Sequence, residues 1–226
     1  MNNYQVLNSD LLSKLQSLSI KAKYVVEGFM IGLHKSPYHG FSVEFSEHRP
    51  YGYGDEVRHI DWKLWSKTNK YYVKQFEEET NLKAHIILDQ SASMDYGSKH
   101  YTKFEYAKLL AASFAYILIK QNDGVGLALF DDKINKLIPA KSMPSHLNVL
   151  FTHMEKASTG SRTNIAQALH QSAEGIYKRG LVIIISDFMD NVEKIINGLR
   201  HLRHKGHEVI AFHIIDNNEI KFDFSD

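Results

Sequence analysis

Apolar and polar residues follow two different patterns along the chain, and the change falls near residue 81. Before it the pattern is mixed. We expect helices at Leu11–Leu18 and Ile20–Met30, a loop over 32–40, and strands around Phe41–Phe45 and Tyr71–Gln75. After residue 81, short apolar runs rich in β-branched residues alternate with longer amphipathic segments. The two patterns divide the chain into an N-terminal strand-and-helix appendage, residues 1–80, and a second domain, residues 81–226.

The second domain is predicted to be a sheet whose strands are separated by helices. We expect strands at Ala84–Asp89, Val125–Phe130, Lys133–Ile138, Leu181–Ser186 and Glu208–Ile215, with a hairpin turn at Asp131 and Asp132. We expect helices at Tyr101–Gln121, Pro144–Lys156, Asn164–Lys178 and Val192–Lys205, the last ending before Gly206. Such alternation is typical of a doubly wound α/β fold with a mostly parallel sheet and helices on both faces.

Composition argues against several classes of protein. The 27 Lys+Arg and 26 Asp+Glu residues leave a formal net charge of +1, unlike a dedicated nucleic-acid binder. Cysteine is absent, which removes disulfides, thiol chemistry and cysteine zinc sites. The start does not resemble a signal peptide, and the longest apolar stretch, Leu109–Ile119, is too short to span a bilayer. We therefore expect a cytoplasmic protein without a membrane segment in this chain.

Histidine is the remaining residue type that could bind zinc. His201, His204 and His207 form the closest group among the 13 histidines. They supply at most three ligands where a structural zinc site takes four, and basic residues are common in the last turn of a helix. We assign no zinc site to them.

The first chemically distinctive motif follows the first strand of the second domain. Asp89, Ser91 and Ser93 form an Asp-x-Ser-x-Ser string at the carboxyl end of Ala84–Asp89, where open α/β sheets bind ligands. One carboxylate and two hydroxyls are hard oxygen donors, which suit Mg²⁺ or Mn²⁺ better than zinc. The simpler alternative is that Asp89 and Ser91 cap the next turn.

Two more polar residues are predicted to join this motif. Asp187 follows the strand Leu181–Ser186, and Thr163 lies in the polar loop that opens the preceding helix. In a doubly wound sheet of strand order 3-2-1-4-5, the first and fourth strands are neighbours, which brings Asp89 and Asp187 side by side. Each residue also has a simpler structural alternative, as a helix cap for Thr163 and as part of a strand-end turn for Asp187.

The combination of Asp-x-Ser-x-Ser with a later Thr and Asp resembles the metal-ion-dependent adhesion site of von Willebrand factor A domains. The resemblance covers about residues 82–215 and implies a Rossmann-like fold. It implies that Mg²⁺ or Mn²⁺ is bound by hydroxyls directly or through water, and by the two Asp side chains mostly through water. It also implies an open coordination position for an Asp or Glu carboxylate of a protein partner. The metal-site residues are then Asp89, Ser91, Ser93, Thr163 and Asp187.

The appendage carries a second resemblance. It is similar to the segment that precedes the A-like domain in the bacterial family called domain of unknown function 58, through Gly32–Ser36, Phe45–Glu47, Arg49–Tyr51, Gly54–Trp62 and Val73–Glu78. Members of that family are often encoded beside MoxR-type AAA+ ATPases, which implies such an ATPase as partner. We expect the appendage to be structural, with Asp61 capping a helix and Trp62 burying apolar surface.

Together these patterns predict a non-enzymatic, metal-dependent protein-binding module. We expect it to act as an adaptor of a MoxR-type AAA+ ATPase in protein or complex maturation, with no catalytic residue and no organic cofactor. The alternative is a Mg²⁺-dependent phosphoesterase or nuclease that uses Asp89 and Asp187. A haloacid-type phosphatase would want an Asp where Ser91 stands. A nuclease would need further acids, and the candidates are Asp95, Asp131 and Asp190.

Overall fold

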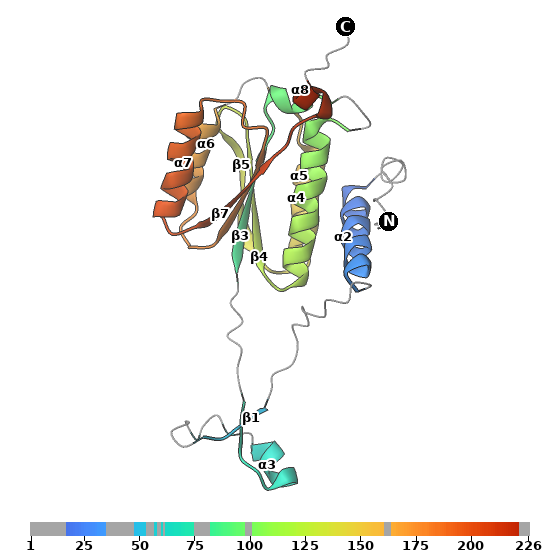
Figure 1. The fold of residues 1–226 in the computed structure, drawn as a ribbon, viewed down its shortest axis with the longest axis vertical. Coiled ribbons are helices and arrows are strands. Elements are labelled where there is room, and N and C mark those ends of the chain that lie inside the picture. Colours follow the sequence, from blue (N-terminus) through green and yellow to red (C-terminus); the bar gives the residue numbers. More distant parts are fainter. Residues whose placement is uncertain are drawn as a thin grey trace. The chain divides into compact units, whose positions relative to one another are not determined.

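The structure is a computed structural model that describes residues 17–34, 48–52, 57, 60, 62–74, 82–97, 101–160 and 164–221. The chain divides into two compact units, one of Met1–Gly32 with Asn81–Asp226 and the other of Leu33–Thr80. Figure 1 labels most of their helices and strands. Three predicted features lie outside the described residues: most of the helix from Leu11, the strand at Phe41–Phe45, and Asp61 as a helix cap.

A five-stranded, mostly parallel sheet forms the centre of the larger unit. Its order is β5-β4-β3-β6-β7, which is the predicted 3-2-1-4-5 arrangement, and only β5 runs antiparallel to its neighbour β4. The first and fourth strands of the domain are therefore adjacent, with Leu88 level with Ile185. The strands are β3 (Lys83–Asp89), β4 (Gly124–Phe130), β5 (Ile134–Lys141), β6 (Leu181–Ser186) and β7 (Glu208–His213).

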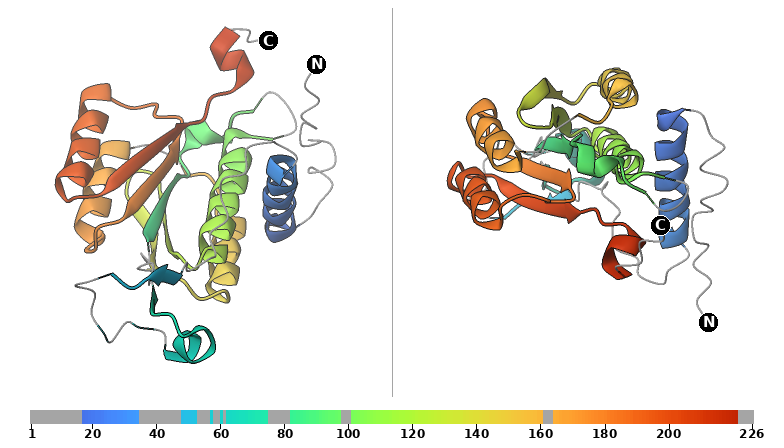
Figure 2. Two further views of the ribbon diagram at one scale, coloured as in Figure 1. Left: turned by 60° about the horizontal axis from the view of Figure 1, so that its bottom comes forward. Right: turned by 90° about the horizontal axis from the view of Figure 1, so that it is seen from above.

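Helices cover both faces of this sheet (Figure 1). One face carries α4 (Lys103–Lys120) and α5 (His146–Lys156), and the other carries α6 (Ile165–Gly175) and α7 (Val192–His204). The helix α2 (Leu18–His34) lies alongside α4, as both views in Figure 2 show, and the Leu18 amide donates to Glu155 Oε1 of α5 at 2.9 Å. Two short elements complete the unit, the 3₁₀ turn η2 (Ala92–Asp95) and α8 (Asn217–Lys221).

The two layers of helices require β3 and β6 to be apolar on both sides. Ile86 and Leu88 of β3 pack in the core beneath α4 and α5, whereas Ile87 packs with Val182 and Ile184 beneath α6 and α7. Both strands are consequently buried almost throughout, which explains their uninterrupted apolar sequence. The polar residues that follow these strands lie where the apolar layers end.

Local hydrogen bonds fix where the helices begin. Thr102 and Glu105 form a reciprocal capping box at the start of α4. Asn164 caps α6, because its side chain accepts from the Gln167 amide at 3.1 Å. The capping role considered as an alternative for Thr163 is therefore filled by its neighbour.

The smaller unit contains β1 (His48–Pro50), which pairs antiparallel with β2 (Tyr72–Lys74), and the helix α3 (Trp62–Thr68). Trp62 begins the helix but remains 52% exposed, so the expectation that it buries apolar surface is wrong. It makes an edge contact with Trp65, at 6.2 Å between ring centroids, and Trp65 in turn stacks on Tyr71.

Several element boundaries differ by a few residues from the sequence prediction. The helix α2 continues to His34, past the expected start of a loop at Gly32, and α6 ends at Gly175 instead of Lys178. The last helix, α8, was not predicted, since five residues give too short a pattern to recognise. None of the helices in the described part of the chain is both long enough and apolar enough to cross a bilayer.

Candidate functional site at the carboxyl edge of the sheet

Asp89 is the centre of the candidate site and is fully buried at the end of β3. Its Oδ1 accepts a hydrogen bond from the Ser91 amide at 2.8 Å, and its Oδ2 accepts one from Ser186 Oγ at 2.5 Å. Burial raises the pKa of Asp89 to about 6, against these hydrogen bonds, and the nearby charge of Asp187 adds to the rise. Among the residues that the structure describes, the carboxylate is thus held by hydrogen bonds without a cationic partner.

The two serines of the motif lie beside it in η2. Ser91 is buried, and its hydroxyl lies 3.1 Å from that of Ser93. Ser91 occupies the position before the 3₁₀ turn, yet its side chain makes no capping hydrogen bond there. The turn after β3 is closed by the Ser91 amide, which donates to Asp89, so neither serine hydroxyl is needed to close it.

Asp187 follows β6 and is 3% exposed. Its Oδ1 accepts from the Met189 amide at 3.2 Å, and its Oδ2 accepts from Lys103 Nζ at 2.9 Å. The predicted neighbourhood of the two acids is reflected in the repulsion that Asp187 exerts on Asp89. Unlike Asp89, Asp187 has a cationic partner.

Lys103 belongs to a triad of charged residues, with Asp187 and Glu219, that the sequence pattern did not indicate. Lys103 Nζ also donates to Glu219 Oε1 of α8 at 2.6 Å, so it bridges two carboxylates. Burial alone would lower the pKa of Lys103, but the hydrogen bonds to Glu219 and Asp187 outweigh it and the pKa is raised. The first turn of a helix usually disfavours a positive charge, so Lys103 would have been expected at the surface.

Thr163 lies outside the described residues, but both of its flanks are held at the same edge of the sheet. On one side, the Gly160 amide donates to the Gln90 carbonyl at 2.6 Å. On the other, the Asn164 amide donates to the Asp131 carbonyl at 3.1 Å. A Cβ on Gly160 would come within 2.4 Å of Asp131 Oδ2, so a larger residue there would displace the Asp131 carboxylate.

The other acids considered for an enzyme have local structural roles or lie at the surface. Asp131 Oδ1 accepts from the Asp132 and Lys133 amides and so closes the turn between β4 and β5. Asp190 accepts from the Ile165 amide at 3.0 Å and from the Asn191 amide at 2.7 Å. Asp95 is exposed on η2.

The loop after Asp187 contains backbone strain. Phe188 has a φ of 53°, in the left-handed region that non-glycine residues rarely adopt. Its amide donates to Ser186 Oγ at 2.9 Å, the same hydroxyl that donates to Asp89. Ser186 therefore links the strained turn to the buried carboxylate, and it is a further residue that the motif did not indicate.

The donor chemistry of the described site residues fits magnesium or manganese. Carboxylate and hydroxyl oxygens are the ligands these ions prefer, and three of the five predicted residues, Asp89, Ser91 and Ser93, lie within one short turn. Within the described ranges, no group of three or more His, Cys, Asp or Glu side chains could hold a metal ion. A metal at this edge would therefore depend on the hydroxyls as well as the acids.

Of the histidines considered for zinc, His201 has its ring nitrogens beside other side chains. His201 Nδ1 lies 2.9 Å from His170 Nδ1, and its Nε2 lies 3.3 Å from Glu174 Oε1. The two ring nitrogens thus face different partners, and the arrangement supplies no convergent ligand set.

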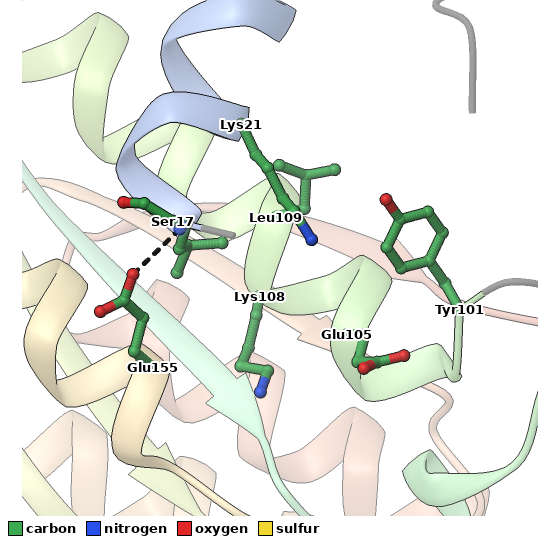
Figure 3. Close-up of a pocket in the computed structure, with 8 residues that line it drawn as sticks. Ser17, Lys21, Tyr101, Glu105, Lys108, Leu109 and Glu155 are labelled. Atoms are coloured by element: carbon green, nitrogen blue, oxygen red, sulfur yellow. Dashed lines mark hydrogen bonds between the residues drawn. The ribbon is translucent and has the colours of Figure 1, made fainter. Parts of the chain in front are cut away.

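A cavity of about 520 Å³ lies away from this site, where the start of α2 meets α4 and α5 (Figure 3). It brings Lys21 and Lys108 together with Glu105 and Glu155, so its lining carries both signs of charge. None of the five predicted site residues lines it.

Residues 47–224 match the family described as "Protein of unknown function DUF58", and the chain belongs to this family. An uncharacterized protein of Mycobacterium tuberculosis is 27% identical over 216 residues, which are 93% of this chain and 67% of that protein. A counterpart in Mycobacterium bovis matches equally. The match with residues 47–224 includes most of both compact units.

Two solved structures have weaker likeness. The conserved hypothetical protein BatB from Bacteroides thetaiotaomicron is 22% identical with a TM-score of 0.45, over 57% of this chain and 65% of BatB. A von Willebrand factor type A protein from Catenulispora acidiphila is 13% identical with a TM-score of 0.40, over 62% of this chain and 33% of that one. Likeness at this level supports no functional argument.

Proposed function

We propose that the chain is a non-enzymatic, metal-dependent protein-binding module of the von Willebrand factor A type. In this proposal, Asp89, Ser91, Ser93, Thr163 and Asp187 hold Mg²⁺ or Mn²⁺ at the carboxyl edge of the sheet. The bound ion would supply an open position that accepts an Asp or Glu carboxylate from a partner. The chain would act as an adaptor of a MoxR-type AAA+ ATPase in the maturation of a protein or complex.

One observation carries the metal part of the proposal: the fully buried Asp89 carboxylate beside the Ser91 and Ser93 hydroxyls. A buried carboxylate is costly unless positive charge or several donors compensate it. The rise in the pKa of Asp89 indicates that its hydrogen bonds with Ser91 and Ser186 do not suffice. A divalent cation is the group that would provide the missing compensation.

The ATPase part of the proposal comes from the family alone. The chain is a family member over most of its length, and such proteins are often encoded beside MoxR-type ATPases. This is an associational argument, separate from the chemistry of the site. The two parts therefore need separate tests.

The alternative of a Mg²⁺-dependent phosphoesterase or nuclease has less support. Asp131 and Asp190 each accept hydrogen bonds from backbone amides, which leaves Asp89 and Asp187 as the acids of the site. Ser91 stands where a haloacid-type phosphatase wants its second Asp. We therefore favour capture of a carboxylate over turnover of a phosphoester.

The test compares wild type with Asp89→Ala, and uses Asp95→Ala as the matched control because Asp95 is an exposed acid on the adjacent turn. Association with the MoxR-type ATPase of the same organism is measured by biolayer interferometry with Mg²⁺ and ATP, with and without EDTA. We expect binding that EDTA and Asp89→Ala abolish and Asp95→Ala preserves. Absence of any association would contradict the adaptor role.

The enzymatic alternative is tested in parallel with p-nitrophenyl phosphate and single-stranded DNA as generic substrates. We expect no hydrolysis above the level of Asp89→Ala protein in Mg²⁺ or Mn²⁺. Metal-dependent hydrolysis by wild type and Asp95→Ala that Asp89→Ala loses would favour the enzyme instead.

A further inference from the structure

Lys103 is a buried cation in direct contact with one of the proposed metal-site residues. It is 3% exposed, although lysines are almost never buried unless they are paired. It is also the first residue of α4, where the positive end of the helix dipole opposes an ammonium group. Burial and the helix dipole thus each destabilise the ammonium group of Lys103 at this position.

The two carboxylates that compensate Lys103 come from different elements of the fold. Asp187 follows β6 and lies beside Asp89, whereas Glu219 belongs to α8 near the end of the chain. Glu219 is itself fixed, because its Oε2 accepts from the Asp216 amide at 2.8 Å. Lys103 therefore has a second, anchored partner that remains if Asp187 is taken from it.

We propose that Lys103 is an internal counter-ion that competes with the divalent cation for Asp187, with Glu219 as the partner to which the ammonium is left when the metal binds. The inference rests on the proposed metal site and specifies how its affinity is set. An ammonium 2.9 Å from Asp187 neutralises that carboxylate and repels a second cation brought beside it. The site then binds metal weakly unless a partner's carboxylate adds negative charge.

The experiment measures Mn²⁺ binding to the full chain from the loss of the free-ion signal in electron paramagnetic resonance. Lys103→Met removes the ammonium with little change in side-chain length. The matched control is Lys108→Met, a partly buried lysine of the same helix that lies over the Phe104 ring and has no ion pair with Asp187. We expect Lys103→Met to bind Mn²⁺ at least about tenfold more tightly than wild type, and Lys108→Met to bind as wild type does.

A conservative variant separates charge from packing. Lys103→Arg keeps a cation able to bridge two carboxylates, so its Mn²⁺ affinity is expected to remain close to that of wild type. Tighter binding by Lys103→Arg, equal to that of Lys103→Met, would show that disturbed packing and not charge controls the affinity, and would overturn the inference.

Removing Lys103 leaves Asp187 and Glu219 without their cationic partner, so Lys103→Met alone could fail to fold. The double variant Lys103→Met/Glu219→Gln removes one cation and one anion and leaves Asp187 for the metal. It is compared with Glu219→Gln alone, and we expect the double variant to bind more tightly. In a foldable variant lacking Lys103, affinity no higher than that of its lysine-containing reference would overturn the inference.

The outcomes distinguish this inference from the proposed function. Equal, Asp89-dependent Mn²⁺ binding by wild type and Lys103→Met would leave the metal site intact and remove the competition. Binding by Lys103→Met alone would support the competition but make the native protein metal-independent. No binding by any variant would contradict the metal site and the inference together.

Discussion

The two strand ends that form the candidate site carry the same side chain in opposite electrostatic settings. At the end of β3, Asp89 is fully buried, and the described residues provide it with hydrogen bonds from Ser91 and Ser186 but with no cation. At the end of β6, Asp187 is nearly as buried but is bound by the Lys103 ammonium. The free-energy cost of a buried carboxylate is therefore determined by its partner and not by its burial. Asp187 is thus compensated by a cation of the chain, whereas the described residues give Asp89 hydrogen bonds without a cation.

The largest expected effect comes from breaking the compensated end. Asp187→Asn removes one of the two acids that hold Lys103 in the interior, and leaving a buried cation partly unpaired is strongly destabilising. We expect the free energy of unfolding in EDTA to fall by about 3 kcal/mol. Urea unfolding followed by circular dichroism measures it. A loss no larger than that of Asp95→Asn would mean that Glu219 alone satisfies Lys103.

The opposite result is expected at the uncompensated end. The pKa of Asp89, about 6 against an ordinary 3.8, indicates that its ionised form costs the folded state roughly 3 kcal/mol near pH 7.5. The amide nitrogen of Asn cannot accept a hydrogen bond, so Asp89→Asn loses part of the bonding that the carboxylate had. This loss offsets part of the stability gained by removing the buried charge. In EDTA we therefore expect Asp89→Asn to be more stable than wild type by on the order of 1 kcal/mol. Urea unfolding at pH 7.5 would contradict this if the variant lost stability.

The pH dependence gives a second readout of the same group. Because the folded-state pKa of Asp89 is raised, the folded wild type binds the proton more tightly than the unfolded chain between about pH 4 and 6. The stability of wild type relative to Asp89→Asn should therefore be highest below about pH 4 and decline as the pH rises through about 6. A difference that is constant over this range would indicate that Asp89 is not desolvated in solution.

The smallest stability effects separate two neighbouring residues in the loop before α6. Asn164→Ala removes the helix cap and should cost about 1 kcal/mol with little change in Mn²⁺ affinity. Thr163→Val keeps the side-chain shape but removes the hydroxyl, so we expect a stability change of less than about 0.5 kcal/mol and several-fold weaker Mn²⁺ binding. Thermal unfolding and paramagnetic titration of both proteins test the pair. If Asn164→Ala weakened Mn²⁺ binding and Thr163→Val lowered only the stability, Thr163 would not belong to the metal site.

The sequence predicted those parts of the site that local pattern determines. β3 and β6 are apolar runs that end in an acid, and their adjacency follows from the strand order of a doubly wound sheet. The turn containing Ser91 and Ser93 is also local. Pattern of this kind placed Asp89 next to Asp187 before any coordinates were considered.

Lys103, Ser186 and Glu219 could not be predicted in the same way. A lysine at the start of a helix normally lies in solvent, and its partner Glu219 is 116 residues away on a helix of only five residues. Ser186 reads as the last residue of a strand, without sign of its bond to Asp89. In the smaller unit, Trp62 was expected inside because indoles usually bury area, but its helix has no buried residue. Ion pairs between distant segments leave no periodicity in sequence.

The separation in sequence between β3 and β6 has a consequence for the order in which the chain folds. The antiparallel pair β4–β5 joins neighbouring segments, whereas the bond from Ser186 to Asp89 closes a loop of 97 residues. Closing long loops costs more chain entropy, so such pairing is expected late in folding. During synthesis, a nascent chain that ends before β6 carries Asp89, Ser91 and Ser93 but no Asp187. We therefore expect carboxylate capture to be withheld until the ribosome has released β6, and pulse-labelled hydrogen exchange should show β6 gaining protection after the β4–β5 hairpin.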